Sequence, residues 1–143
     1  MVKYCTYRIL PEFNIIIEFY SGPVNLSDLT DIRNKLINEK LLINNFNFIV
    51  DLRNAVFDLH TNVVEEFISY VKQKSDLIWK RKTSIISLTP NQSAFSVLYI
   101  SDLGNSPLKV NTFSTIESAL KWVDLPPSAQ PHIEKVIDEM KKQ

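Results

Sequence analysis

FNFIVDLRNAVFDLHTNVVEEFISYV, residues 46–71, carries the pattern that decides the fold of this chain. Its apolar start predicts a strand over residues 46–52 that is covered on both faces, because apolar side chains do not alternate there with polar ones. A short polar turn is expected after Asp51, and apolar residues then recur at helical spacing from Val63 onward. In α/β proteins, the loop at the carboxyl end of such a strand is the usual place for a functional site. We therefore expect the site at this strand–helix junction.

The remaining elements predict an α/β domain with a mixed sheet of about five strands. Pro11 and Glu12 are too short a link for a parallel crossover, so the first two strands should form an antiparallel hairpin that ends at residues 21–23. Helix-length connections follow, and they predict parallel strands with helices packed on the sheet. Besides residues 46–52, the expected strands are residues 4–10, 13–20, 83–88 and 108–113.

Helix starts are marked by side chains that accept hydrogen bonds from the first free backbone amides of a helix. The capping residues that we expect are Asn25, Thr61, Thr89 and Ser114. Pro90 and Gln92 strengthen the signal at Thr89, because proline suits the first helical position and glutamine completes a capping box. The helix that follows, residues 93–103, is apolar almost all round and is predicted to be well buried.

The composition excludes several classes of function. Sixteen basic residues balance sixteen acidic ones, so no overall charge favours binding to nucleic acid. Two glycines cannot form a glycine-rich phosphate loop, and a single cysteine, Cys5, allows neither an intrachain disulfide nor a cysteine metal cluster. No apolar run approaches the ~20 residues that cross a bilayer, and no signal-peptide pattern is present. We expect a cytoplasmic protein without a cofactor, a bound metal or a membrane span.

The chain divides into three parts by sequence. Residues 1–124 are predicted to form the α/β domain, and residues 125–131 are predicted to be a proline-rich linker. Residues 132–143 should form a short amphipathic helix, which needs an apolar surface to dock on. That surface belongs either to its own domain or to a second copy in a homodimer. The apolar stripe of this helix is Ile133, Val136, Ile137 and Met140.

Three local patterns, together with the order of elements over residues 13–124, resemble STAS domains of the SpoIIAA-like group of anti-sigma-factor antagonists. The sequence IVDL at residues 49–52, continued to Thr61, is similar to the strand and loop that hold the phosphoacceptor of that group. Residues 89–95 and the pattern VNTF at residues 110–113, followed by ESALKW, resemble small uncharacterised bacterial proteins of the STAS/CRAL-TRIO-like class. The resemblance implies a SpoIIAA-like mixed sheet with an extra C-terminal helix.

The same resemblance implies a non-enzymatic regulatory or protein-interaction domain, of the kind used in bacterial signalling and anti-sigma partner switching. Thr61 takes the position of the serine that a partner kinase phosphorylates in that group. Leu59 replaces the carboxylate of the Asp-Ser-Ser-Gly loop and Asn62 replaces its glycine. The implied partner is a protein. The residues of this chain that we expect at the phosphoacceptor and partner-contact loop are Thr61, His60, Asp58, Asp51 and Arg53.

Each candidate residue also has a simpler interpretation. Thr61 is accounted for as a helix cap without any kinase. His60 beside Asp58 lacks the spacing of a metal site. Asp51 lacks the acidic pair of a phosphoaspartate site, and we expect it to pair with Arg53 or to accept loop amides. Cys5, in an apolar strand near the start of the chain, is expected to be a packed thiol.

The alternative function is a small-molecule or lipid-binding domain of CRAL-TRIO-like character. The helix over residues 93–103 would then line an apolar pocket through Phe95, Leu98 and Tyr99. Enzymatic activity is not expected, because no convergent set of Cys, His and Asp residues and no Gly-x-Ser-x-Gly elbow occur in the sequence.

Overall fold

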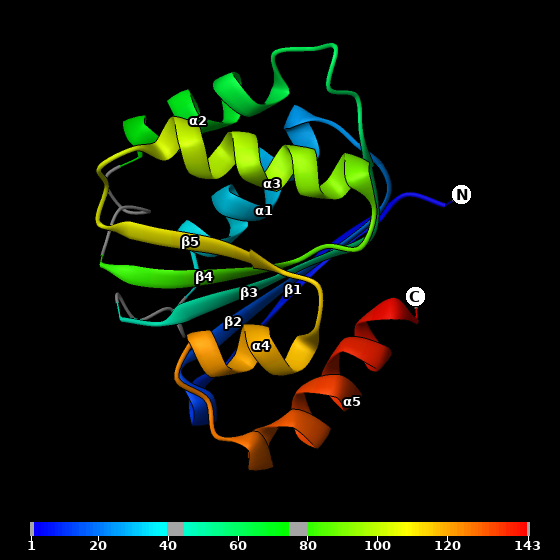
Figure 1. The fold of residues 1–143 in the computed structure, drawn as a ribbon, viewed down its shortest axis with the longest axis vertical. Helices are drawn as coiled ribbons and strands as arrows, with labels where there is room; N and C mark the ends of the chain where they lie inside the picture. The colour runs from blue at the N-terminus through cyan, green and yellow to red at the C-terminus, as the bar shows by residue number, and fades with distance from the viewer. Residues whose placement is uncertain (1, 40–44, 75–79, 143) are drawn as a thin grey trace.

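The computed structural model describes residues 2–39, 45–74 and 80–142. Its centre is a five-stranded sheet in the order β1-β2-β3-β4-β5. Helices α1 (Leu26–Ile37), α2 (Val63–Gln73) and α3 (Pro90–Leu103) form one layer, and α4 (Ile116–Trp122) and α5 (Gln130–Lys141) cover the opposite face (Figure 1). Within the described parts of the chain, every helix is too short or too polar to span a bilayer.

The first two strands form the expected antiparallel hairpin. β1 (Tyr4–Leu10) pairs with β2 (Ile15–Val24), and the 3-10 turn η1 (Pro11–Phe13) joins them. β3 (Asn47–Phe57), β4 (Arg81–Ile86) and β5 (Leu108–Phe113) then follow parallel to β2 and to one another. The prediction of a mixed sheet with an antiparallel first strand is therefore confirmed.

β2 does not end where the sequence suggested. Residues 21–23 were expected to close the hairpin, but the strand continues through them to Val24. These residues pair with Asn54, Ala55 and Val56 of β3, which holds them in the sheet, and Gly22 and Pro23 lie beyond the last residue that pairs with β1. The hydrogen bonds of a strand from a distant part of the chain thus override the turn signal of Gly22 and Pro23.

β3 is also longer than expected, and it contains a bulge in place of the polar turn after Asp51. Phe19 pairs with Asp51, whereas Ser21 pairs with Asn54, so Leu52 and Arg53 lie opposite Tyr20 alone. The extra residue changes which side chains face the α1–α3 layer. Side chains in the core on that side come from Phe48, Val50 and Leu52 before the bulge and from Ala55 and Phe57 after it.

The sheet is buried on both faces, which explains the near-continuous apolar sequence of its central strands. In β2, Ile16 and Tyr20 pack into the core beneath α1–α3, whereas Ile15, Ile17 and Phe19 pack into the core shared with α4 and α5. The two faces of one strand therefore supply two separate cores. The prediction of a doubly covered strand is confirmed for β3 as well.

Two of the expected helix caps are confirmed and two are wrong. Asn25 and Thr89 each form a full capping box. The N-cap of α4 is Thr115 and not Ser114, because the Thr115 hydroxyl is the one that accepts the Ser118 amide. The N-cap of α2 is Asn62 and not Thr61, and its side chain makes no capping bond.

Helix α3 is buried along one face only. Val97 is 57% exposed and Leu98 is 45% exposed, so the expectation of burial nearly all round is wrong. The helix lies at the edge of its layer, beside α2. Its buried residues are Gln92, Phe95, Ser96, Tyr99 and Leu103. Apolar composition therefore overstated the burial of this helix.

The C-terminal region packs on the same domain. Residues 125–131, which were expected to be a linker, contain the 3-10 turn η3 (Pro127–Ala129), and α5 begins at Gln130 instead of residue 132. Pro131 fits the first turn of α5, where its missing amide hydrogen costs no bond. The apolar stripe of α5 is buried against the sheet and α4 within this chain.

Gly22 gives a direct test of how the N-terminal segment packs. Its φ is +82°, and a Cβ there would lie 2.8 Å from Cα of Lys3. We expect Gly22→Ala to lower the free energy of unfolding by about 1–3 kcal/mol, because both the backbone conformation and the close approach oppose a side chain. Urea unfolding measures this, with Ser21→Ala as the control at less than about 0.5 kcal/mol. Equal effects from both variants would contradict the close packing at Gly22.

Candidate functional site

The loop between β3 and α2, residues 58–62, lies at the carboxyl end of the parallel strands (Figure 1). β2 ends beside it at Val24 and leads into α1 through Asn25. The β3–α2 junction identified in the sequence therefore lies next to a second strand–helix junction, the one between β2 and α1. Side chains from both junctions line one depression, which includes Val24, Asn25 and Thr61.

Asp58, His60 and Thr61 are exposed and form a compact turn. The Asp58 carboxylate accepts the His60 backbone amide at 3.1 Å. The Asp58 carbonyl accepts the Thr61 hydroxyl at 2.7 Å and the Thr61 amide at 3.3 Å. Thr61 thus fixes the turn. Its place in the sequence had suggested a cap of α2, and it does not form one. The structure brings these three predicted loop residues together.

Asp51 and Arg53 form the predicted pair, at the bulge in β3. Oδ1 of Asp51 accepts hydrogen bonds from the backbone amide and from Nε of Arg53. Oδ2 of Asp51 accepts one from Nη2 of Arg53, and all three bonds are 3.0 Å long. The Asp51 side chain is fully buried, and its hydrogen bonds raise the pKa of the Arg53 guanidinium. Arg53 lies on the α4/α5 side of the sheet, where it lines a small depression with Glu134 and Asp138. The pair is therefore a support within β3 and is not part of the loop.

Three depressions meet at the start of α2. One of about 320 Å³ lies between the β2–α1 junction and the loop. A second, of about 180 Å³, lies between the loop, α2 and α3, and a third, of about 540 Å³, runs between α1 and α2. Asn62 lines all three, and Thr61 lines the first two. The region around the β3–α2 loop is thus a surface on which several depressions adjoin.

Phe95, Leu98 and Tyr99 do not line one cavity. Phe95 stacks on Phe57 with ring centroids 3.8 Å apart, and Tyr99 stacks near Phe67 at 5.7 Å. Both residues are buried, and their rings occupy the space beneath α3. Leu98 faces outward instead and lines the depression beside the loop. The rings that were expected to line an apolar pocket thus fill that space themselves.

A buried charged group was missed in the sequence. Glu18 of β2 is fully buried, and it accepts hydrogen bonds from the Tyr20 hydroxyl at 2.6 Å and from Arg33 of α1. The Arg33 guanidinium also lies 5.0 Å from the ring centroid of Phe48. Glu18 interrupts the run IIIEFY, and that interruption was the available signal. The group lies inside the core beneath α1–α3 and links β2 to α1.

Other reactive side chains lie apart from the loop. Cys5 is half-buried in β1, and burial raises the pKa of its thiol to about 11, so the thiolate is scarce near neutral pH. Among the residues that the structure describes, no group of three or more His, Cys, Asp or Glu side chains could hold a metal ion. The chemistry available at the loop is therefore that of the Thr61 hydroxyl, the His60 imidazole and nearby carboxylates.

The chain matches no protein-family model and no curated protein sequence. Among solved structures, it is similar to an uncharacterised protein of the DUF3478 family with a SpoIIAA-like fold, from Shewanella loihica PV-4. The TM-score is 0.57 at 12% sequence identity, and the alignment covers 85% of this chain and 93% of that one. The likeness shows the fold: this chain has the SpoIIAA-like fold that its resemblance to STAS domains predicted.

The different roles of Thr61 and Thr89 can be separated by stability. Thr89→Ala should lower the free energy of unfolding by about 1 kcal/mol, because Thr89 accepts the Gln92 amide as a true cap. Thr61→Ala removes only an exposed hydrogen bond to a carbonyl, and we expect a loss of less than about 0.5 kcal/mol. Urea unfolding of both variants checks this. A larger loss for Thr61→Ala would restore Thr61 as the helix cap.

Proposed function

We propose that this chain is a non-enzymatic, STAS-like regulatory domain that acts by docking a protein partner around the β3–α2 loop. The docking face is defined as residues 58–62, Asn25 and Leu26 of the β2–α1 junction, the first two turns of α2, and Leu98 and Asp102 of α3. The observation that supports it most is the meeting of three depressions at Asn62, beside the exposed Thr61, in a SpoIIAA-like fold. A bacterial signalling pathway of the partner-switching type is the setting that we propose.

Docking fits this loop better than catalysis does. The Thr61 hydroxyl donates to the Asp58 carbonyl, which cannot take up a proton as a general base must. The recorded contact of His60 to this turn is made by its backbone amide, not by its imidazole. A nucleophile needs a base within hydrogen-bond reach, and the turn presents a backbone carbonyl in that position.

Thr61 is the candidate phosphoacceptor within this proposal. It is exposed, and it lies one residue before the N-cap of α2. A phosphate would add about −1.5 to −2 charges to the centre of the docking face. The amides at the start of α2 would favour that charge, whereas Asp58, Glu65 and Glu66 would oppose it. Modification of Thr61 would therefore change the charge that a partner meets.

The docking face can be tested with a change of bulk that adds no charge. The partner is captured from an extract of the source cells, identified, purified and titrated by calorimetry against wild type and Thr61→Tyr. A tyrosine would fill the depression shared by Thr61 and Asn62, and we expect binding at least about tenfold weaker, or about 1.4 kcal/mol. The matched control is Ser114→Tyr, an exposed position before α4, which should bind as wild type does.

The opposite pattern would contradict the proposal. If Ser114→Tyr weakens the complex and Thr61→Tyr leaves it unchanged, the partner binds near α4 and the docking face is wrong. Circular dichroism of both variants confirms that each retains its fold before the affinities are compared.

A further inference from the structure

The docking face carries negative charge although the whole chain is neutral. Asp58, Glu65, Glu66 and Asp102 line the three depressions, and each is exposed. Among the residues that the structure describes, neither lysine nor arginine lines any of the three. The chain holds sixteen basic and sixteen acidic residues, so this separation of charge is a property of the surface and not of the composition.

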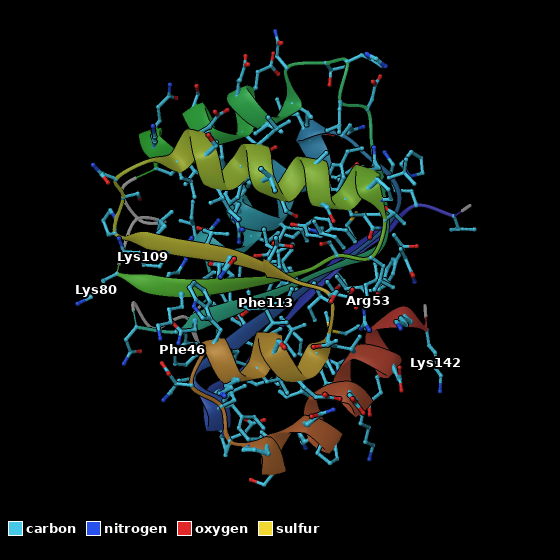
Figure 2. The ribbon with its side chains drawn as sticks, viewed as in Figure 1. Phe46, Arg53, Lys80, Lys109, Phe113 and Lys142 are labelled. Atoms are coloured by element: carbon cyan, nitrogen blue, oxygen red, sulfur yellow. The ribbon has the colours of Figure 1, made fainter. Side chains whose placement is uncertain are left out.

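Within the described residues, these four carboxylates form no ion pair, and only Asp58 uses a side-chain oxygen in the turn, where Oδ1 accepts the His60 amide. Lys3, which approaches the β2–α1 junction, pairs with Asp28 at 3.0 Å. Lys80 and Lys109 lie at the amino ends of β4 and β5, at the far end of the sheet (Figure 2).

Apolar side chains lie between the carboxylates. Leu98 is 45% exposed, and Leu26 and Leu59 are half-buried in the walls of the depressions. Glu65 borders the depressions on both sides of α2, and Glu66 borders the two nearer α1. The two depressions nearer α1 have mainly apolar walls, the one beside Leu98 is mainly polar, and all three have acidic edges.

We infer that the partner of this domain presents a basic segment in which lysine or arginine flanks apolar side chains. This inference rests on the proposed function and adds the chemistry of the partner. Apolar residues would enter the two depressions that Leu26 lines, and the cations would lie over the acidic edges, where complementary charge speeds association and excludes acidic competitors. The carboxylates are spread over the loop, α2 and α3, which suits an extended segment and not a single metal ion.

Charge also argues against a nucleic acid or an anionic membrane as the occupant. Both present phosphate groups, which the four carboxylates would repel at low salt. A second copy of this chain could offer Lys80 and Lys109 instead, and the experiment distinguishes that case. Exposed charges are screened within roughly 10 Å at 0.1 M salt, so binding of the basic segment must weaken as salt is raised.

The test is selection from a phage-displayed library of random 12-residue peptides on three forms of the full chain. These are wild type, Glu65→Gln/Glu66→Gln, and Glu117→Gln/Glu134→Gln as the matched control. Glu117 and Glu134 are exposed on α4 and α5, so the control loses the same charge from the opposite layer. Peptides selected on wild type should combine lysine or arginine with leucine or other apolar residues.

Synthetic copies of the selected peptides are titrated against these three forms and against Thr61→Tyr, and they should bind the first double variant roughly tenfold more weakly than wild type. They should bind the control variant as tightly as they bind wild type. Their affinity for wild type should fall as salt is raised from about 50 to about 300 mM, because the Debye length shortens over that range. Melting temperatures of the three forms show whether any loss reflects unfolding.

Three results would overturn the inference, each for a different reason. Peptides that lose binding to Thr61→Tyr but carry no excess of basic residues would leave the docking face intact and remove the charge requirement. Basic peptides that bind Thr61→Tyr and Glu65→Gln/Glu66→Gln as well as wild type would remove the docking face itself. Salt-sensitive dimerisation of the wild type that Glu65→Gln/Glu66→Gln abolishes would assign the surface to a second copy.

Discussion

Asp51 binds Arg53 through three hydrogen bonds at the point where β3 gains one residue relative to β2. A carboxylate buried this deeply is stable only when its oxygens are paired, and here one residue supplies all three recorded donors. The bulge lets Ala55 and Phe57 face the same core as Leu52. Phe57 then stacks on Phe95 of α3, and the β3–α2 loop leaves the sheet on the side of the α1–α3 layer. The docking face depends on that geometry.

Much of this fold could be predicted from local patterns. Continuous apolar strands indicated a sheet covered on both faces, and the short link after β1 indicated an antiparallel start. The lengths of β2 and β3 could not be predicted, because Ser21 and Asn54 are polar and their pairing extends both strands beyond the apolar runs. The pairing joins residues far apart in sequence, so neither strand shows it alone. The predicted cap at Thr61 was wrong for a similar reason, because its hydroxyl donates a hydrogen bond to the Asp58 carbonyl and does not cap α2.

The sequence identified the position of the candidate site but not the character of its surface. The strand–helix junction at residues 58–62 was predicted, and so was the pairing of Asp51 with Arg53. The acidic character of the surface was hidden, because Asp102 comes from α3 and the total charge is zero. Glu18 and Arg33 were hidden as well: each interrupts an apolar pattern, but only the fold shows that the two meet.

Amide hydrogen exchange of Asp51→Asn tests most directly whether the Asp51–Arg53 pair holds the bulge and the loop that follows it. Asparagine keeps the shape of the side chain but places an amide donor where one carboxylate oxygen faces Arg53. The account predicts that amides of residues 53–62 exchange faster by at least about tenfold, while those of Ile16 and Ile17 in β2 change little. Equal acceleration in both regions, or none in residues 53–62, would show that the loop does not depend on this pair.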